Sequence, residues 1–117
     1  MLAMILGCIA LGLMALTVGA LTVKWIVNKI KVKKALRYIK RVMLADIRKL
    51  VNSCDNTVTL NQLEDLSKKG YTHVMADFDA QNEIVGDVEI IKDTNRQLDN
   101  EVGNLLGYNG MVLVDVK

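Results

Sequence analysis

The feature that most constrains this chain is an uninterrupted apolar run at its N-terminus. No Asp, Glu, Lys, Arg, His, Asn or Gln occurs between Met1 and Val23. As a helix, residues 2–23 would be about 33 Å long, enough to cross a hydrocarbon core of about 30 Å. A core helix of a water-soluble protein normally carries a polar face, and this run has none. The sequence therefore predicts a transmembrane helix over residues 2–23.

The charges divide the chain into three zones. Residues 1–23 carry no charge, residues 24–51 carry ten basic residues and one acidic residue, and residues 52–117 carry five basic and twelve acidic residues. These zones, at 0, +9 and −7, give the net charge of +2. Because Lys and Arg beside a membrane helix remain on the cytoplasmic side, the charges predict a single-pass protein of the cell membrane. Its N-terminus is expected outside and its C-terminus in the cytoplasm.

Two alternatives to a retained membrane helix stay open. A cleaved signal peptide would place its charges before an apolar stretch of about 7–15 residues, although residues 18–20 would serve as a small-residue cleavage site. A lipoprotein would use Cys8, but only seven residues precede it. Cys8 and Cys54 lie in different zones, which favours unpaired thiols and a reducing compartment for Cys54.

Small residues within the apolar run recur at helical spacing. Separations of 4, 3, 4 and 3 place them on one side of a helix: Cys8, Gly12, Ala15, Gly19 and Thr22. Small residues let membrane helices approach closely, so this stripe predicts a helix-packing face. It also predicts a homo-oligomer or another membrane protein as partner. The general abundance of Gly and Ala in membrane helices is the alternative explanation.

A basic amphipathic helix, or stalk, is predicted directly after the apolar run, over residues 24–52. The chain has no Pro and no Gly between Gly19 and Gly70, so nothing forces a break from the membrane helix. Cations beside a membrane are attracted to an anionic inner leaflet, and Trp suits the headgroup region. The expected membrane-interface residues are Lys24, Trp25, Lys29, Lys31, Lys33 and Lys34.

The basic helix has two further candidate partners. One is the acidic segment of the chain itself or of a neighbouring copy, which carries the opposite charge. The other is nucleic acid, which is a weaker candidate because only Tyr38 is available for stacking on bases.

A small acidic domain is predicted over residues 59–117, after a linker at residues 53–58. Capping boxes at Thr59–Gln62 and Thr94–Gln97 predict two helices, and alternating apolar residues predict three strands. The expected elements are helices over 60–69 and 95–106 and strands over 71–78, 83–92 and 111–116. The predicted fold is thus α+β. A long N-terminal transmembrane and juxtamembrane helix precedes an α-β-β-α-β domain with a mostly antiparallel three-stranded sheet.

No catalytic, metal or cofactor motif accompanies these elements. Oxygen donors alternate from Asp77 to Glu83, but a calcium loop needs Gly at its sixth position and Glu at its twelfth, where Asn82 and Val88 stand. His73 is the only histidine, and the sequence names no ligand or nucleophile to accompany it. No glycine-rich phosphate loop opens a helix. We therefore expect no cofactor, no metal and no small-molecule substrate.

These observations predict a non-enzymatic, membrane-anchored interaction module that acts as a subunit or adaptor of a membrane-associated assembly. The alternative is a small pore-forming or membrane-remodelling protein of the kind that mobile elements encode. A pore needs a polar face in the span, whereas this span offers only two threonines and a cysteine. A ligand sensor would need a pocket that a domain of about 60 residues barely encloses.

Overall fold

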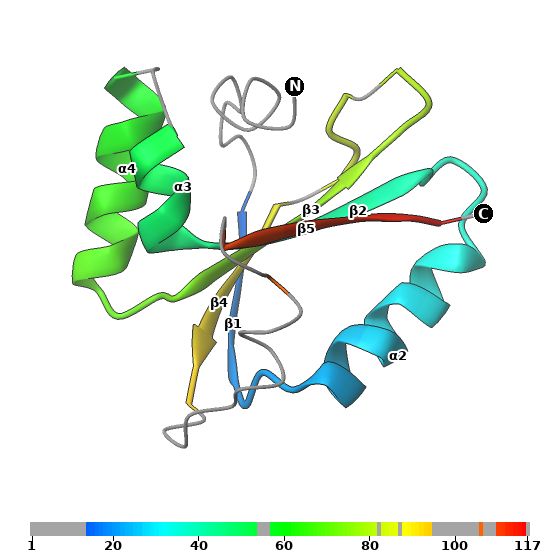
Figure 1. The fold of residues 1–117 in the computed structure, drawn as a ribbon, viewed down its shortest axis with the longest axis horizontal. Helices are drawn as coiled ribbons and strands as arrows, with labels where there is room; N and C mark the ends of the chain where they lie inside the picture. Colours follow the sequence, from blue (N-terminus) through cyan, green and yellow to red (C-terminus); the bar gives the residue numbers. More distant parts are fainter. Residues whose placement is uncertain are drawn as a thin grey trace.

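One sheet carries buried apolar side chains on both of its faces, and helices cover each face (Figure 1). The computed structural model describes residues 14–53, 57–81, 83–86, 88–94, 106 and 110–116. Within them the fold is α+β, with a five-stranded mixed sheet and three helices. The elements are β1 (Met14–Gly19), α2 (Val23–Lys34), β2 (Arg41–Asp46), α3 (Ile47–Ser53), α4 (Thr57–Lys68), β3 (His73–Phe78), β4 (Val88–Asp93) and β5 (Met111–Asp115).

The strand order in the sheet is β1-β4-β3-β2-β5. The β2–β3, β2–β5 and β3–β4 pairs are antiparallel, and only β1 and β4 run parallel. Met14 of β1 lies beside Val88 of β4, so the first strand joins a segment far along the sequence. Strand β2 lies inside the sheet, where Met43 faces Ala76 on one side and Leu113 on the other.

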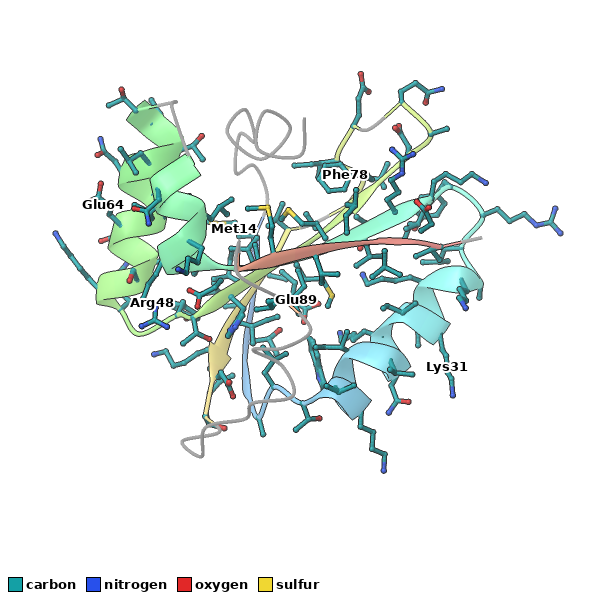
Figure 2. The ribbon with its side chains drawn as sticks, viewed as in Figure 1. Met14, Lys31, Arg48, Glu64, Phe78 and Glu89 are labelled. Carbon is teal, nitrogen blue, oxygen red and sulfur yellow. The ribbon has the colours of Figure 1, made fainter. Side chains whose placement is uncertain are left out.

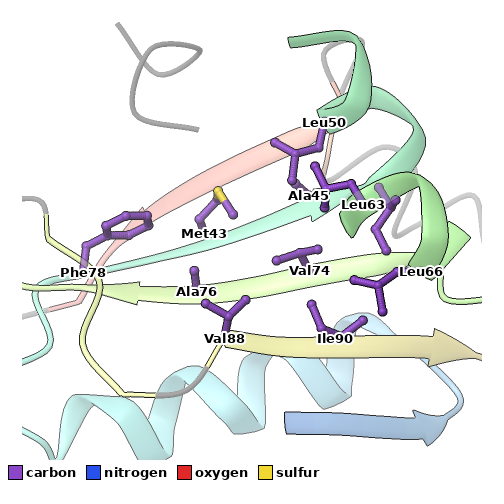
Figure 3. Packing of buried hydrophobic residues seen from close by; sticks show 11 residues of the cluster. Met43, Ala45, Leu50, Leu63, Leu66, Val74, Ala76, Phe78, Val88 and Ile90 are labelled. Atoms are coloured by element: carbon purple, nitrogen blue, oxygen red, sulfur yellow. The ribbon is translucent and has the colours of Figure 1, made fainter. Parts of the chain in front are cut away.

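Helices α3 and α4 cover one face of the sheet (Figure 3). Leu50 of α3 and Leu63 and Leu66 of α4 pack against strand residues that alternate with those of the opposite face. The strand residues buried there are Met43, Ala45, Val74, Ala76, Phe78, Val88 and Ile90. Burial of this apolar surface is the main stabilising contribution on this side.

Helix α2 covers the other face. Its Ile26 packs with Leu44, Met75 and Ile91 of the three central strands. The hydroxyl of Thr22 caps the helix by accepting a hydrogen bond from the Trp25 backbone N–H at 3.1 Å. Three lysines in the last turn suit the negative end of the helix dipole.

The prediction that the membrane helix continues into the basic helix, straight or gently bent, is wrong in the part that the structure describes. Residues 14–19 form β1 and residues 41–46 form β2. The segment from Val42 to Ala45 is apolar at four consecutive positions and buried on both faces, a pattern that fits a central strand as well as a helix. None of the helices in the described ranges is long and apolar enough to cross a bilayer. The predicted span also includes residues 1–13, which lie outside the description.

The elements predicted for the C-terminal half are largely confirmed. The helix predicted at 60–69 is α4, although it begins at Thr57, so Thr59 lies buried inside the helix and does not cap it. The three predicted strands correspond to β3, β4 and β5. The three-stranded sheet is wrong, because β1 and β2 add two strands and β1 makes the sheet mixed. The predicted helix over 95–106 and its Thr94–Gln97 capping box lie outside the described residues, apart from Thr94 and Leu106.

Two leucines of the apolar N-terminal run test this fold. Leu21 is 1% exposed in the core under α2, whereas Leu16 on β1 is 59% exposed. We expect Leu21→Ala to lower the free energy of unfolding by about 2–5 kcal/mol and Leu16→Ala by about 0.5 kcal/mol or less. Denaturant unfolding followed by Trp25 fluorescence measures both. Equal losses would contradict the placement of these residues.

Candidate functional site

Helix α2 carries five lysines, and the fold divides them between two sides of the helix. Lys29 and Lys33 turn toward the sheet, where each meets a carboxylate. Lys24, Lys31 and Lys34 face solvent, and Figure 2 shows Lys31 pointing away from the sheet. The two sides of the helix therefore have different chemistry.

The inner side of α2 forms a polar seam with the sheet, made by Thr17, Lys29, Lys33, Asp77 and Glu89. The Nζ of Lys33 lies 2.7 Å from Asp77 Oδ2, and the Nζ of Lys29 lies 3.3 Å from Glu89 Oε1. The hydroxyl of Thr17 donates to Glu89 Oε2 at 3.2 Å. The seam thus connects α2 to β1, β3 and β4.

The Lys33–Asp77 pair is the more buried part of the seam. The two side chains are 14% and 13% exposed. The second carboxylate oxygen of Asp77, Oδ1, is buried and has no hydrogen-bond partner among the described residues. Lys33 is therefore the main compensation for the charge of Asp77, and removing it would leave a buried anion without a counter-charge.

The outer face of α2 and the following turn is basic and partly apolar. Its exposed residues are Lys24, Lys31, Val32, Lys34, Leu36, Arg37, Tyr38 and Lys40. The sequence has no acidic residue before Asp46, so no acidic side chain of this segment offsets those cations. Cations interleaved with exposed apolar side chains are typical of a surface that binds the headgroup region of an anionic membrane.

The structure divides the six residues predicted for the membrane interface. Lys24, Lys31 and Lys34 are exposed on the outer face. Lys29 and Lys33 pair with carboxylates of the polar seam, with side chains that are 39% and 14% exposed, and their contact with lipid stays a prediction. Trp25 is half-buried against the core under α2, and Lys29 Nζ lies 5.2 Å from its ring centroid.

The predicted stripe of small residues is not a helical stripe in the described part. Ala15 and Gly19 lie in β1, and Thr22 caps α2. The spacing of 4 and 3 aligns residues only on a helix, whereas on a strand every second residue shares a face. Cys8 and Gly12 lie outside the described residues. Self-association stays a prediction, without this helical face to support it.

Sequence reasoning missed the carboxylates of the polar seam. Asp77 lies between Ala76 and Phe78 in β3, and Glu89 lies between Val88 and Ile90 in β4; an acidic residue between buried apolar neighbours indicates a charge with a partner. In the sequence, Asp77 is instead the first of the alternating oxygen donors that suggest a calcium loop. In the structure the neighbouring Asp79 accepts backbone hydrogen bonds from Gln81 and Glu83 at 2.9 and 3.0 Å, which makes a turn.

His73 lies at the start of β3 in a tight hydrogen-bond arrangement. Its Nδ1 is 2.7 Å from the Thr72 hydroxyl, which accepts the Asp93 backbone N–H at 3.1 Å and lies 3.2 Å from the Ile91 carbonyl oxygen. All three contacts are satisfied when Nδ1 carries the proton and the Thr72 hydroxyl donates to Ile91. Burial lowers the pKa of His73 below 6.5, while Asp46 and Asp93 act in the opposite direction.

The polar seam predicts a strong effect of Lys33→Met. The substitution leaves the buried Asp77 carboxylate without a counter-charge. We therefore expect the free energy of unfolding to fall by about 3 kcal/mol, the low end of the range for a broken buried pair. Lys33→Met combined with Asp77→Leu should recover most of the loss. The control, Lys31→Met on the outer face, should change stability by about 0.5 kcal/mol or less. A loss of similar size in both single variants would contradict the seam.

His73 predicts a pH dependence of stability. Its folded pKa lies below that of the unfolded chain, so between these two values the unfolded state binds more protons. Stability should therefore fall as the pH drops below about 6.5, and His73→Gln should lose less on the same acidification. Denaturant titrations of both proteins at pH 7.5 and 5.5 measure the difference. Parallel losses in the two proteins would refute this role of His73.

The chain was compared with protein-family models, with curated proteins and with solved structures, and no match was found. Among the described residues, the outer face of α2 combines cations with exposed apolar side chains and has no acidic residue from the same segment. Lys40, at its end, lies near Asp79 and Asp115 of other segments.

Proposed function

We propose that this chain is a non-enzymatic interaction module that attaches to an anionic membrane surface through the outer face of α2. At that surface it serves as a subunit or adaptor of a membrane-associated assembly. The observation that carries the proposal is the exposed set Lys24, Lys31, Lys34, Arg37 and Lys40, interleaved with exposed Val32, Leu36 and Tyr38.

The dimensions of α2 favour a helix that lies along the membrane. Its 12 residues are about 18 Å long, so a helix projecting outward would hold its far cations beyond the Debye length of about 8 Å. Lying flat, the helix keeps all its exposed lysines close to the lipid. Each cation near an anionic leaflet contributes about 1 kcal/mol, and the apolar side chains add to this by insertion.

The proposed location is the cytoplasmic face of the cell membrane, because anionic lipids concentrate in that leaflet. This retains the predicted side for the acidic C-terminal half. The helix that makes contact is α2, since residues 14–19 pair with β4 as a strand.

The adaptor role is supported by the edge of the sheet at β1. Among the described residues β1 pairs only with β4, and Met14, Leu16 and Val18 of this strand are exposed. An exposed apolar edge strand is a common site for the addition of a strand from another protein. The homo-oligomer predicted from the sequence remains a candidate user of this edge.

Vesicle co-sedimentation of the full chain tests the lipid contact. We expect binding to vesicles that contain phosphatidylglycerol to exceed binding to pure phosphatidylcholine, and to weaken when salt rises from about 0.1 to 1 M, because the Debye length shrinks. Lys31→Glu/Lys34→Glu should weaken binding to the anionic vesicles at least about tenfold.

The matched control is Lys68→Glu/Lys69→Glu, which makes the same charge change on exposed lysines outside α2. It should bind like the unmodified chain. If both double variants lost the same amount of binding to anionic vesicles, net charge alone would explain the loss. That result would overturn the outer face of α2 as the membrane-binding surface. Equal binding to both kinds of vesicle would overturn the anionic lipid as partner.

A further inference from the structure

An apolar cavity lies between α2 and the half of the sheet formed by β2 and β5. Its volume is about 100 Å³. The residues that line it are all apolar and include Val27 and Ile30 of α2, Val42 and Leu44 of β2, and Val112 and Val114 of β5. Val27 is 44% exposed and the two β5 valines are half-buried, so the cavity is accessible from solvent beside the edge strand.

The cavity follows from the way α2 is held. The polar seam draws one side of the helix toward β3 and β4 through Lys33 and Lys29. On the opposite side, Val27 faces the short valine side chains of β5. Among the described residues, the ion pairs of α2 reach β3 and β4 but not β5, and the short valine side chains of β5 leave space beside the helix.

The accessible side of the cavity is bordered by positive charge. Lys31 follows Val27 by one helical turn, and Lys34 follows Ile30 by one turn, so both lie next to lining residues on α2. Both lysines are exposed. The nearest acidic residue of β5, Asp115, alternates with Val114 and so faces the other side of the sheet, where it pairs with Arg41 at 3.1 Å.

We propose that this cavity binds the end of a single aliphatic chain whose anionic head group pairs with Lys31 and Lys34. An apolar cavity of about 150 Å³ accommodates a benzene molecule, so one of this size accepts the last few carbons of a chain. Its almost entirely apolar lining disfavours water as the occupant. The inference rests in part on the proposed function, because Lys31 and Lys34 belong to both.

Methyl spectra of the full chain, titrated with decanoate, test the proposal. We expect saturable shifts at the methyl groups of Val27, Ile30, Val112 and Val114, and none at Val58, an exposed valine of α4. Decanol has the same chain without the charge and should bind about tenfold more weakly. Decyltrimethylammonium, with the opposite charge, should bind more weakly still.

Two variants separate the contribution of the ligand's aliphatic chain from that of its anionic head group. Val114→Phe places a larger side chain in the cavity and should abolish the shifts, whereas the control Val58→Phe should retain them. Lys31→Glu/Lys34→Glu lies on the surface and leaves the packing intact. It should weaken decanoate about tenfold and leave decanol unchanged. This second variant keeps the test decisive should Val114→Phe unfold the protein.

A free fatty acid and an anionic phospholipid present the same chemistry, and vesicles distinguish them. If the bound aliphatic chain belongs to a phospholipid, Val114→Phe should also weaken binding of the protein to phosphatidylglycerol vesicles. If it comes from a free fatty acid, that binding should be unchanged while decanoate binding is lost. Absent shifts at the cavity methyl groups, or equal binding of decanoate and decanol, would overturn the inference. Vesicle binding that persists in that case would leave the proposed function standing.

Discussion

Charge pairing beneath α2 determines how this helix lies on the sheet, because Lys33 and Asp77 are both largely buried and neither can turn away without stranding the other. With Lys33 and Lys29 directed inward, helical periodicity directs Lys24 and Lys31 outward. The same orientation leaves Val27 beside the edge strand, where the apolar cavity forms. The cationic surface and the cavity are therefore two consequences of one buried interaction.

The elements with local determinants were predictable from the sequence. Glycines with a positive φ mark the ends of two of them: Gly70 at 94° follows α4, and Gly110 at 69° precedes β5. Strands β1 and β2 lack such determinants, because an apolar run without alternation fits a buried strand and a helix equally well. What decides between them is pairing with β4, β3 and β5, segments distant in the chain. That information is absent from any local window of residues.

The candidate site was predictable to the same extent. The cluster of lysines after the apolar run is visible in the sequence, and three of the five on α2 do face solvent. Which lysines turn inward depends on Asp77 and Glu89, whose positions beside α2 arise only when the sheet is assembled. The apolar cavity likewise depends on β5 packing beside β2, so no spacing within α2 indicates it.

The parallel pairing of β1 with β4 has a consequence for biosynthesis. Strand β1 leaves the ribosome early, but Val88 and the rest of its partner strand are added roughly 70 residues later, which takes about 4–15 s at ordinary elongation rates. During that interval the apolar segment has no strand to join. It is then open to any cellular factor that recognises apolar nascent chains. Pairing of β1 with β4 therefore competes with binding of the apolar segment by such a factor, and it can begin only after β4 has been translated.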